Sequence, residues 1–137
     1  MASHRLWRDT IYKSVILDTS AILMLFEFSI SLDKEITRLL GSYKIIVPST
    51  VVDELKTLST QGNGKTAQNA KSSINLLKRY DIREITASST DTSLLKLAQQ
   101  LKGYILTNDK ELRKRCKKHF IPVLYLRAKK KLALEEV

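Results

Sequence analysis

The sequence has few of the residues that build specialised scaffolds. Its single cysteine, Cys116, excludes an intrachain disulfide framework and a four-cysteine zinc site. None of its four glycines falls in a phosphate-cradling motif, which disfavours a dinucleotide-binding protein or a nucleoside triphosphatase. The longest apolar run, Ala21–Phe26, is too short to cross a membrane, and the first thirteen residues lack the apolar run of a signal peptide. We therefore expect a soluble, cytoplasmic protein with no membrane partner.

Negative charge is also scarce. The chain has 24 Lys and Arg against 14 Asp and Glu, a net charge of +10, which favours a polyanionic partner such as nucleic acid. Residues 101–137 hold eleven of the basic residues and four of the acids, a net +7. Charge alone leaves two interpretations open: a solvated basic helix and tail, or a surface that faces a polyanion.

The 137 residues indicate a single domain in which short apolar strands alternate with helical patterns. This alternation predicts parallel β-α-β units and a three-layer α/β/α sandwich with a parallel sheet of four or five strands. We expect an N-terminal arm (1–13), the folded body (14–126) and a basic C-terminal tail (127–137) that is helical or frayed. The expected strands are 14–17, 44–47, 82–85, 104–107 and 122–126, and the expected helices are 21–26, 33–41, 50–58, 65–80, 91–102 and 109–119, with a loop at 61–64.

Two aspartates follow predicted strands. Asp18 ends the first strand, at the edge of the sheet where ligands bind in such folds. It could instead cap the next helix, although Thr19 and Ser20 could do that equally well. Asp109 follows the fourth strand and lies on the inward stripe of its helix, and a pattern like a capping box from Asn108 to Glu111 would cap that helix without Asp109. We therefore favour a functional role for both aspartates.

Two further acids lie near predicted helix starts. Glu54 falls on the border of the apolar face of its helix, whereas Asp53 falls on the far side, towards solvent. Glu54 is thus either an inward-facing site residue or a surface acid that suits the helix dipole. Asp91 lies on the apolar stripe of its helix, where an unpaired acid is costly. A capping box from Ser88 to Asp91 is the alternative explanation.

These four acids are expected at one edge of the sheet. Clustered carboxylates repel each other, and a divalent cation relieves that repulsion. Oxygen ligands favour hard ions, Mg²⁺ or Mn²⁺. An acidic metal pocket beside a basic surface is what phosphodiester hydrolysis requires, because the basic wall binds the phosphate backbone and the metal activates water.

The four acids lie in four short segments: Val15–Leu23, Ile46–Leu55, Thr90–Ala98 and Leu106–Leu112. In these segments the sequence resembles the PIN domain family of metal-dependent nucleases. The segments occur in the family's order, and the resemblance runs from Val15 to about Leu126. The resemblance implies catalytic acids at Asp18, Glu54, Asp91 and Asp109, with a polar helper at Thr107. Glu111 stands where many members carry a further acid, usually Asp, and Ser20 where many carry Asn.

The resemblance also implies a mechanism and partners. Asp18, Asp91 and Asp109 would hold the metal, while Glu54 completes the site or orients the water. Attack of this water on the phosphorus would leave RNA products with 5′-phosphate and 3′-hydroxyl ends. A homodimer is expected. The basic residues expected to bind RNA are Lys110, Arg113, Lys114, Lys117, Lys118, Arg127, Lys129 and Lys130.

Three roles remain open from sequence. The first is a metal-dependent endoribonuclease, and the basic C-terminal residues resemble the lineage that processes ribosomal RNA precursors. The second is a toxin ribonuclease held by an antitoxin partner. The third is a module that binds RNA or a ribosome precursor without cutting it.

Overall fold

The computed structural model describes residues 12–128 and 130–136. Most of the expected arm and the predicted RNA-binding residue Lys129 lie outside these residues. A six-stranded sheet runs through the centre of the described chain, in the order β3-β2-β1-β4-β5-β6. Its strands are β1 (Lys13–Leu17), β2 (Tyr43–Pro48), β3 (Asp81–Arg83), β4 (Tyr104–Leu106), β5 (Val123–Ala128) and β6 (Lys131–Glu135).

The first five strands are parallel, as the sequence predicts, and β6 pairs with β5 in the antiparallel direction. At the centre of the sheet, Ile16 of β1 is in register with Ile46 of β2 on one side and with Ile105 of β4 on the other. All three side chains are buried. The central strands are continuous apolar runs because helices cover both of their faces.

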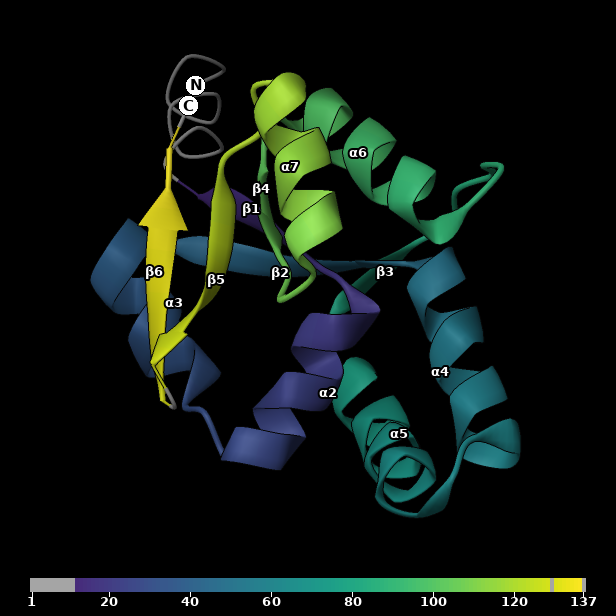
Figure 1. Cartoon of the computed structure of the whole chain (residues 1–137). Helices are drawn as coiled ribbons and strands as arrows, with labels where there is room; N and C mark the ends of the chain where they lie inside the picture. The colour runs from purple at the N-terminus through teal and green to yellow at the C-terminus, as the bar shows by residue number, and fades with distance from the viewer. Residues whose placement is uncertain (1–11, 129, 137) are drawn as a thin grey trace, which may run out of the picture.

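The helices between the strands form the two outer layers (Figure 1). The chain leaves β1 towards β2 and β3 in one direction and returns to β4 and β5 in the other. Right-handed crossovers therefore place the helices of the two halves on opposite faces. The first face carries α2 (Thr19–Phe28), α3 (Leu32–Leu40), α4 (Ser49–Gln61) and α5 (Gly64–Leu77), and the second carries α6 (Thr90–Leu101) and α7 (Lys110–Lys118).

This reversal creates a topological switch point between β1 and β4. Ligands of open parallel sheets bind beyond the carboxyl ends of the strands at such a point. The backbone joins the two strands there, because the amide N–H of Asp18 donates to the carbonyl of Leu106 at 3.1 Å. The fold thus fixes the end of β1 against the end of β4.

The prediction of a helical or frayed tail from Arg127 is wrong. The segment continues β5 to Ala128 and returns as β6, so the sheet has one strand more than expected. Leu132 is buried, and its backbone N–H donates to Glu35 of α3 while its carbonyl accepts from Arg38. The residues Leu-Ala-Leu-Glu-Glu favour a helix by themselves, but pairing with β5 and α3 overrides that preference.

Several element ends also differ from the prediction. The helix expected over 33–41 is α3, which starts one residue earlier at Leu32 with Ser31 as its cap, and Asp33 accepts a hydrogen bond from the Tyr43 hydroxyl. The expected loop at 61–64 shrinks to Gly62 and Asn63, because α4 and α5 both extend into it. No helix in the described part of the chain is both long and apolar enough to cross a membrane.

Candidate functional site

Asp18 lies at the centre of the site, directly after β1. It is the N-cap of α2, and it is only 6% exposed. Its Oδ1 accepts from the N–H of Thr19, and its Oδ2 accepts from the hydroxyls of Ser20 and Thr107, all at 2.7 Å. These three donors fix the carboxylate in one orientation. Asp18 therefore caps α2, which was the alternative interpretation of the sequence, and its catalytic role stays a prediction.

The surroundings of Asp18 disfavour its ionised form. Burial raises its pKa above the usual value for an aspartate, and the nearby negative charge of Asp91 adds to the rise. The hydrogen bonds from Thr107, Ser20 and Thr19 oppose it. A buried carboxylate of this kind gains from a nearby cation.

Thr107, directly after β4, connects two of the predicted acids. Its fully buried hydroxyl donates to Asp18 and accepts from the backbone N–H of Asp109 at 3.0 Å. Ser20 makes a parallel link, because its hydroxyl donates to Asp18 and accepts from the N–H of Asn108 at 3.2 Å. The two hydroxyls hold the segment after β4 against the start of α2. The resemblance implied a polar helper at Thr107, and that role stays a prediction.

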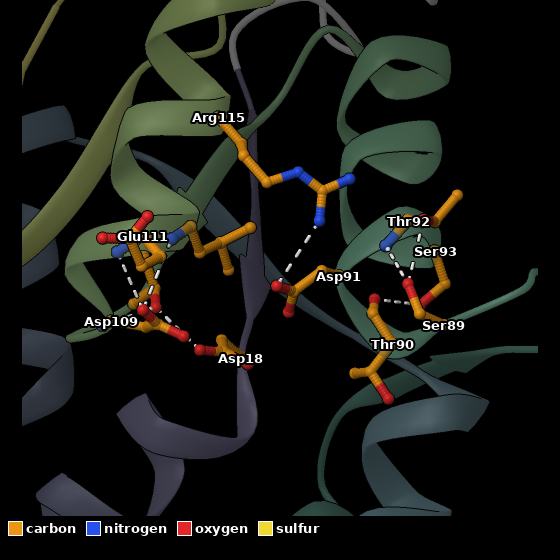
Figure 2. A network of polar contacts seen from close by, with 11 residues as sticks. Asp18, Ser89, Thr90, Asp91, Thr92, Ser93, Asp109, Glu111 and Arg115 are labelled. Atoms are coloured by element: carbon orange, nitrogen blue, oxygen red, sulfur yellow. Dashed lines mark hydrogen bonds and ion pairs between the residues drawn. The ribbon is translucent and has the colours of Figure 1, made fainter.

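Asp109 is the N-cap of α7. Its Oδ1 accepts from the N–H groups of Glu111 at 2.9 Å and Leu112 at 3.4 Å (Figure 2). The prediction that Asn108 would supply this cap is wrong. No hydrogen bond from residues 12–128 or 130–136 reaches Oδ2 of Asp109, so this oxygen is free of partners among the described residues.

The other two acids come from α6 and α4. Asp91 lies in the first turn of α6, and the cap of that helix is Ser89, so the alternative of a capping box that begins at Ser88 is wrong. Glu54 lies on α4, is exposed, and accepts a hydrogen bond from the hydroxyl of Thr19. Partial burial raises the pKa of Asp91, and the negative charges of Asp109 and Glu54 raise it further, while Arg115 opposes the rise. The ionisation of Asp91 therefore depends on the charges of Asp109 and Glu54.

All four acids line one cavity of about 740 Å³. Asp53 also lines it, although the helical pattern placed that residue towards solvent. The helix turns its exposed flank to the cavity, which an apolar stripe alone does not reveal. The remaining lining residues are hydroxyl-bearing or small apolar side chains: Thr19, Ser20, Leu23, Thr50, Thr57, Leu58, Ala87, Ser89 and Thr90.

The predicted RNA-binding residues that the structure describes lie on α7 and on the β5–β6 hairpin. Lys110, Lys114, Lys117 and Lys118 are exposed on α7, as are Arg127 and Lys130 further along the chain. Arg113 differs, because its guanidinium contacts Glu135 at 3.1 Å and stacks 3.7 Å from the ring centroid of Tyr125. It packs β5 and β6 onto α7.

Glu111 lies apart from the acids of the cavity. Its side chain is exposed and pairs with Lys114 at 3.6 Å, and it does not line the cavity. Arg115, which sequence reasoning did not include among the site residues, reaches Asp91 (Figure 2). Only the packing of α7 beside α6 reveals that contact.

The donor set fits a hard divalent cation. The cavity offers carboxylate oxygens from four separate segments. Burial raises the pKa values of Asp18 and Asp91, and repulsion from neighbouring carboxylates adds to the rise. Among the described residues, no three His, Cys, Asp or Glu side chains already converge as a metal cluster. Asp18 is fixed, so the more exposed carboxylates of Asp91 and Asp109 would have to move towards it to complete a coordination sphere.

The fold and the acidic cavity define an α/β protein with a carboxylate site at the switch point of its sheet. The family model described as "PIN like domain" matches residues 15–129, and the chain belongs to that family. It is 32% identical over 120 residues to ribonuclease VapC4 of Methanocaldococcus jannaschii, covering 85% of this chain and 92% of that protein. It is 33% identical to ribonuclease VapC9 of Archaeoglobus fulgidus over 69% of this chain and 70% of the relative.

Solved structures share the fold. The PIN domain endonuclease Utp24 superposes with a TM-score of 0.74 at 24% identity, over 90% of this chain and 92% of that one. VapBC2 from Rickettsia felis, bound to a DNA fragment from its promoter, matches with a TM-score of 0.56 at 18% identity, over 74% of this chain and 92% of the other. These likenesses confirm the mixed α/β architecture and its mostly parallel sheet.

Proposed function

We propose that this chain is an endoribonuclease of the PIN-like family that hydrolyses RNA phosphodiester bonds with a divalent cation, Mg²⁺ or Mn²⁺. One observation carries the proposal: Asp18, Glu54, Asp91 and Asp109 come from four segments and line one cavity at the switch point of the sheet. The names of the two similar archaeal ribonucleases support the reaction class.

The residues of the chain would divide the work. Asp18, Asp91 and Asp109 would hold the cation, which when bound neutralises the carboxylates and polarises the water and the phosphate. Thr107 and Ser20 fix the orientation of Asp18 and the position of Asp109. Glu54 lies on the cavity wall with its carboxylate exposed, where it can orient a water molecule and accept its proton.

The basic surface would bind the substrate. Lys110, Lys114, Lys117 and Lys118 project from the helix that begins at Asp109. Phosphate contacts of this kind supply affinity that does not depend on sequence and that weakens with salt. RNA lying along α7 would therefore pass the mouth of the acidic cavity. Since RNA is the proposed substrate, we place the activity in the cytoplasm.

Two neighbouring acids on α7 provide the test. Asp109→Asn keeps a good N-cap, since asparagine caps helices as well as aspartate does, but it removes a carboxylate from the cavity. Glu111→Gln removes a carboxylate of the same charge two residues after Asp109, but outside the cavity. We expect Asp109→Asn to reduce Mn²⁺-dependent RNA cleavage about 100-fold or more, and Glu111→Gln to change it less than about threefold.

The outcome separates cutting from binding. RNA ends with 5′-phosphate and 3′-hydroxyl groups support attack by water, whereas cyclic phosphates contradict it. Equal losses in the two variants contradict the assignment of the site. If the wild type binds RNA and cleaves none with either metal, the chain is instead the non-catalytic binding module.

The similarity to two VapC ribonucleases favours, as the biological setting, a toxin paired with an inhibitory VapB-type partner. Growth arrest on induction, absent for Asp109→Asn, would support the toxin role. An active enzyme that leaves growth unchanged but cleaves a ribosomal RNA precursor would support processing instead. Light scattering of the purified chain tests the proposed homodimer, for which we expect twice the 15.6 kDa mass of one chain.

A further inference from the structure

Arg115 brings a positive charge to the acidic cavity. It lies on α7, and its Nη1 is 3.5 Å from Oδ2 of Asp91 on α6 (Figure 2). The two side chains are 43% and 37% exposed. Within the described part of the chain, the carboxylate of Asp91 forms no other ion pair or hydrogen bond. The pair therefore joins the two helices of one face directly at the site.

The other basic side chains of α7 do not pair with an acid of the cavity. Arg113 pairs with Glu135, and Lys114 pairs with Glu111, outside the cavity. Lys117 and Lys118 form no ion pair with any described residue. Among residues 12–128 and 130–136, Arg115 is thus the one cation in contact with a carboxylate that lines the cavity.

The negative charges around Asp91 favour a guanidinium beside its carboxylate. Asp91 experiences the negative charges of Asp109 and Glu54, which disfavour its own ionisation, and Arg115 opposes them. A divalent cation in the cavity would relieve the same repulsion more strongly and would be repelled by Arg115. The guanidinium and the metal therefore stabilise the same carboxylate, and each disfavours the other.

From this geometry we infer that Arg115 is an intramolecular counter-cation that competes with the divalent cation for Asp91 and sets the metal concentration at which the site fills. The inference rests on the proposed function, since it concerns the same acidic cavity. Arg115 is a positioning residue, which holds Asp91 while the metal is absent and releases it when the metal binds. Its freed guanidinium is then available to an RNA phosphate, whose geometry suits bidentate contact.

The contact is weak enough to be exchanged. Its distance is long for a charge-assisted hydrogen bond, and both side chains are partly exposed to solvent. Exposed ion pairs contribute little and carboxylate oxygens are preferred ligands of hard cations, so the metal can displace the guanidinium. Removing the pair and its repulsion should raise the affinity for the metal about three- to tenfold.

The test measures Mn²⁺ binding to the full chain by titration calorimetry, without RNA. We expect Arg115→Gln to bind Mn²⁺ about three- to tenfold more tightly than the wild type, and Arg115→Lys to bind with intermediate affinity. Lys118→Gln is the matched control, because it removes the same charge from the same helix without a contact to Asp91, and its Mn²⁺ affinity should change less than about twofold. Thermal denaturation without metal checks that each variant is folded.

A second readout follows the released guanidinium. At saturating Mn²⁺, Arg115→Gln should raise the KM for RNA, and Arg115→Lys should restore part of it. A Kd for Mn²⁺ that is unchanged in Arg115→Gln, or that falls equally in Lys118→Gln, would overturn the inference. The proposed function would survive that result provided that Asp109→Asn abolishes Mn²⁺ binding. Failure of the wild type to bind Mn²⁺ at all would overturn both.

Discussion

The hydroxyl of Thr107 lies at the junction of the site, and Thr107→Val tests its role with little change in shape. Valine replaces the hydroxyl by a methyl group in a fully buried position. The change removes the donor to Asp18 Oδ2 at 2.7 Å and the acceptor of the Asp109 N–H at 3.0 Å. Both consequences follow from one atom, so the loss can be estimated bond by bond.

The bond to Asp18 dominates the estimate. A hydrogen bond to a charged group contributes about 1.5–3 kcal/mol, and the part-buried Asp109 N–H can exchange its lost partner for water at a small further cost. We expect the free energy of unfolding to fall by about 2–3 kcal/mol. For a chain of this length, that corresponds to a Tm lower by about 6–15 °C.

The assay is thermal denaturation of the metal-free protein at pH 7.5 and again near pH 4. The Thr107 bond favours ionised Asp18, so it holds the pKa of that carboxyl below the value it would reach in the variant. Its contribution is therefore present above the pKa of Asp18 in the folded protein and is lost as the pH falls through it. We expect the difference in Tm between wild type and variant to narrow towards pH 4.

The control is Thr50→Val, which breaks the neutral hydroxyl contact between Thr50 and Ser93, 2.6 Å apart. This variant should lose about 1 kcal/mol, with no dependence on the ionisation of Asp18. If Thr107→Val costs no more than Thr50→Val, or if its cost is equal at both pH values, Thr107 does not stabilise a charged Asp18.

Three other substitutions test the charge of the site and the corrected C-terminal strand. Asp18→Asn should raise the Tm of the metal-free protein at pH 7.5, because burial raises the pKa of Asp18 and its charge costs stability above that pKa; a lower Tm would contradict this. Glu35→Gln should lower the Tm more at pH 7 than at pH 3, because the Arg38 hydrogen bond lowers the pKa of Glu35 and its stabilisation is lost as the pH falls through that lowered value; equal decreases would refute the assignment. Leu132→Ala should cost about 2–4 kcal/mol in urea denaturation, since Leu132 is 2% exposed; a cost under about 1 kcal/mol would exclude β6 from the core.

Local patterns predicted the sheet well where neighbouring layers reinforce them. Val15, Ile16 and Leu17 form a buried β-branched and aliphatic run, and the structure places them in the central strand. The same logic failed for residues 131–135. Their preference is helical, and the partners that make them a strand, β5 and Glu35, lie far away along the sequence. Non-local pairing decides such a segment, and composition does not record it.

The candidate site shows the same division. Each of Asp18, Asp91 and Asp109 could be located from its position relative to a strand end or an apolar stripe. Arg115 could not, because its contact with Asp91 depends on how two helices that are separated by β4 pack together. The location of Asp53 on the cavity wall likewise depends on which flank of α4 faces the other helices.

Asp18 and Asp109 both cap helices and both line the cavity, so capping and a role in the candidate site are compatible at these positions. A carboxylate has two oxygens, and a helix start supplies backbone N–H groups that fix its orientation. Asp109 gives Oδ1 to two N–H groups of α7 and keeps Oδ2 for the cavity. Asp18 gives Oδ1 to Thr19, while Oδ2 is held by two hydroxyls. The backbone N–H groups of each helix start thus fix the orientation of the capping carboxylate. A capping position therefore supports a site role for an acid at the end of a parallel strand.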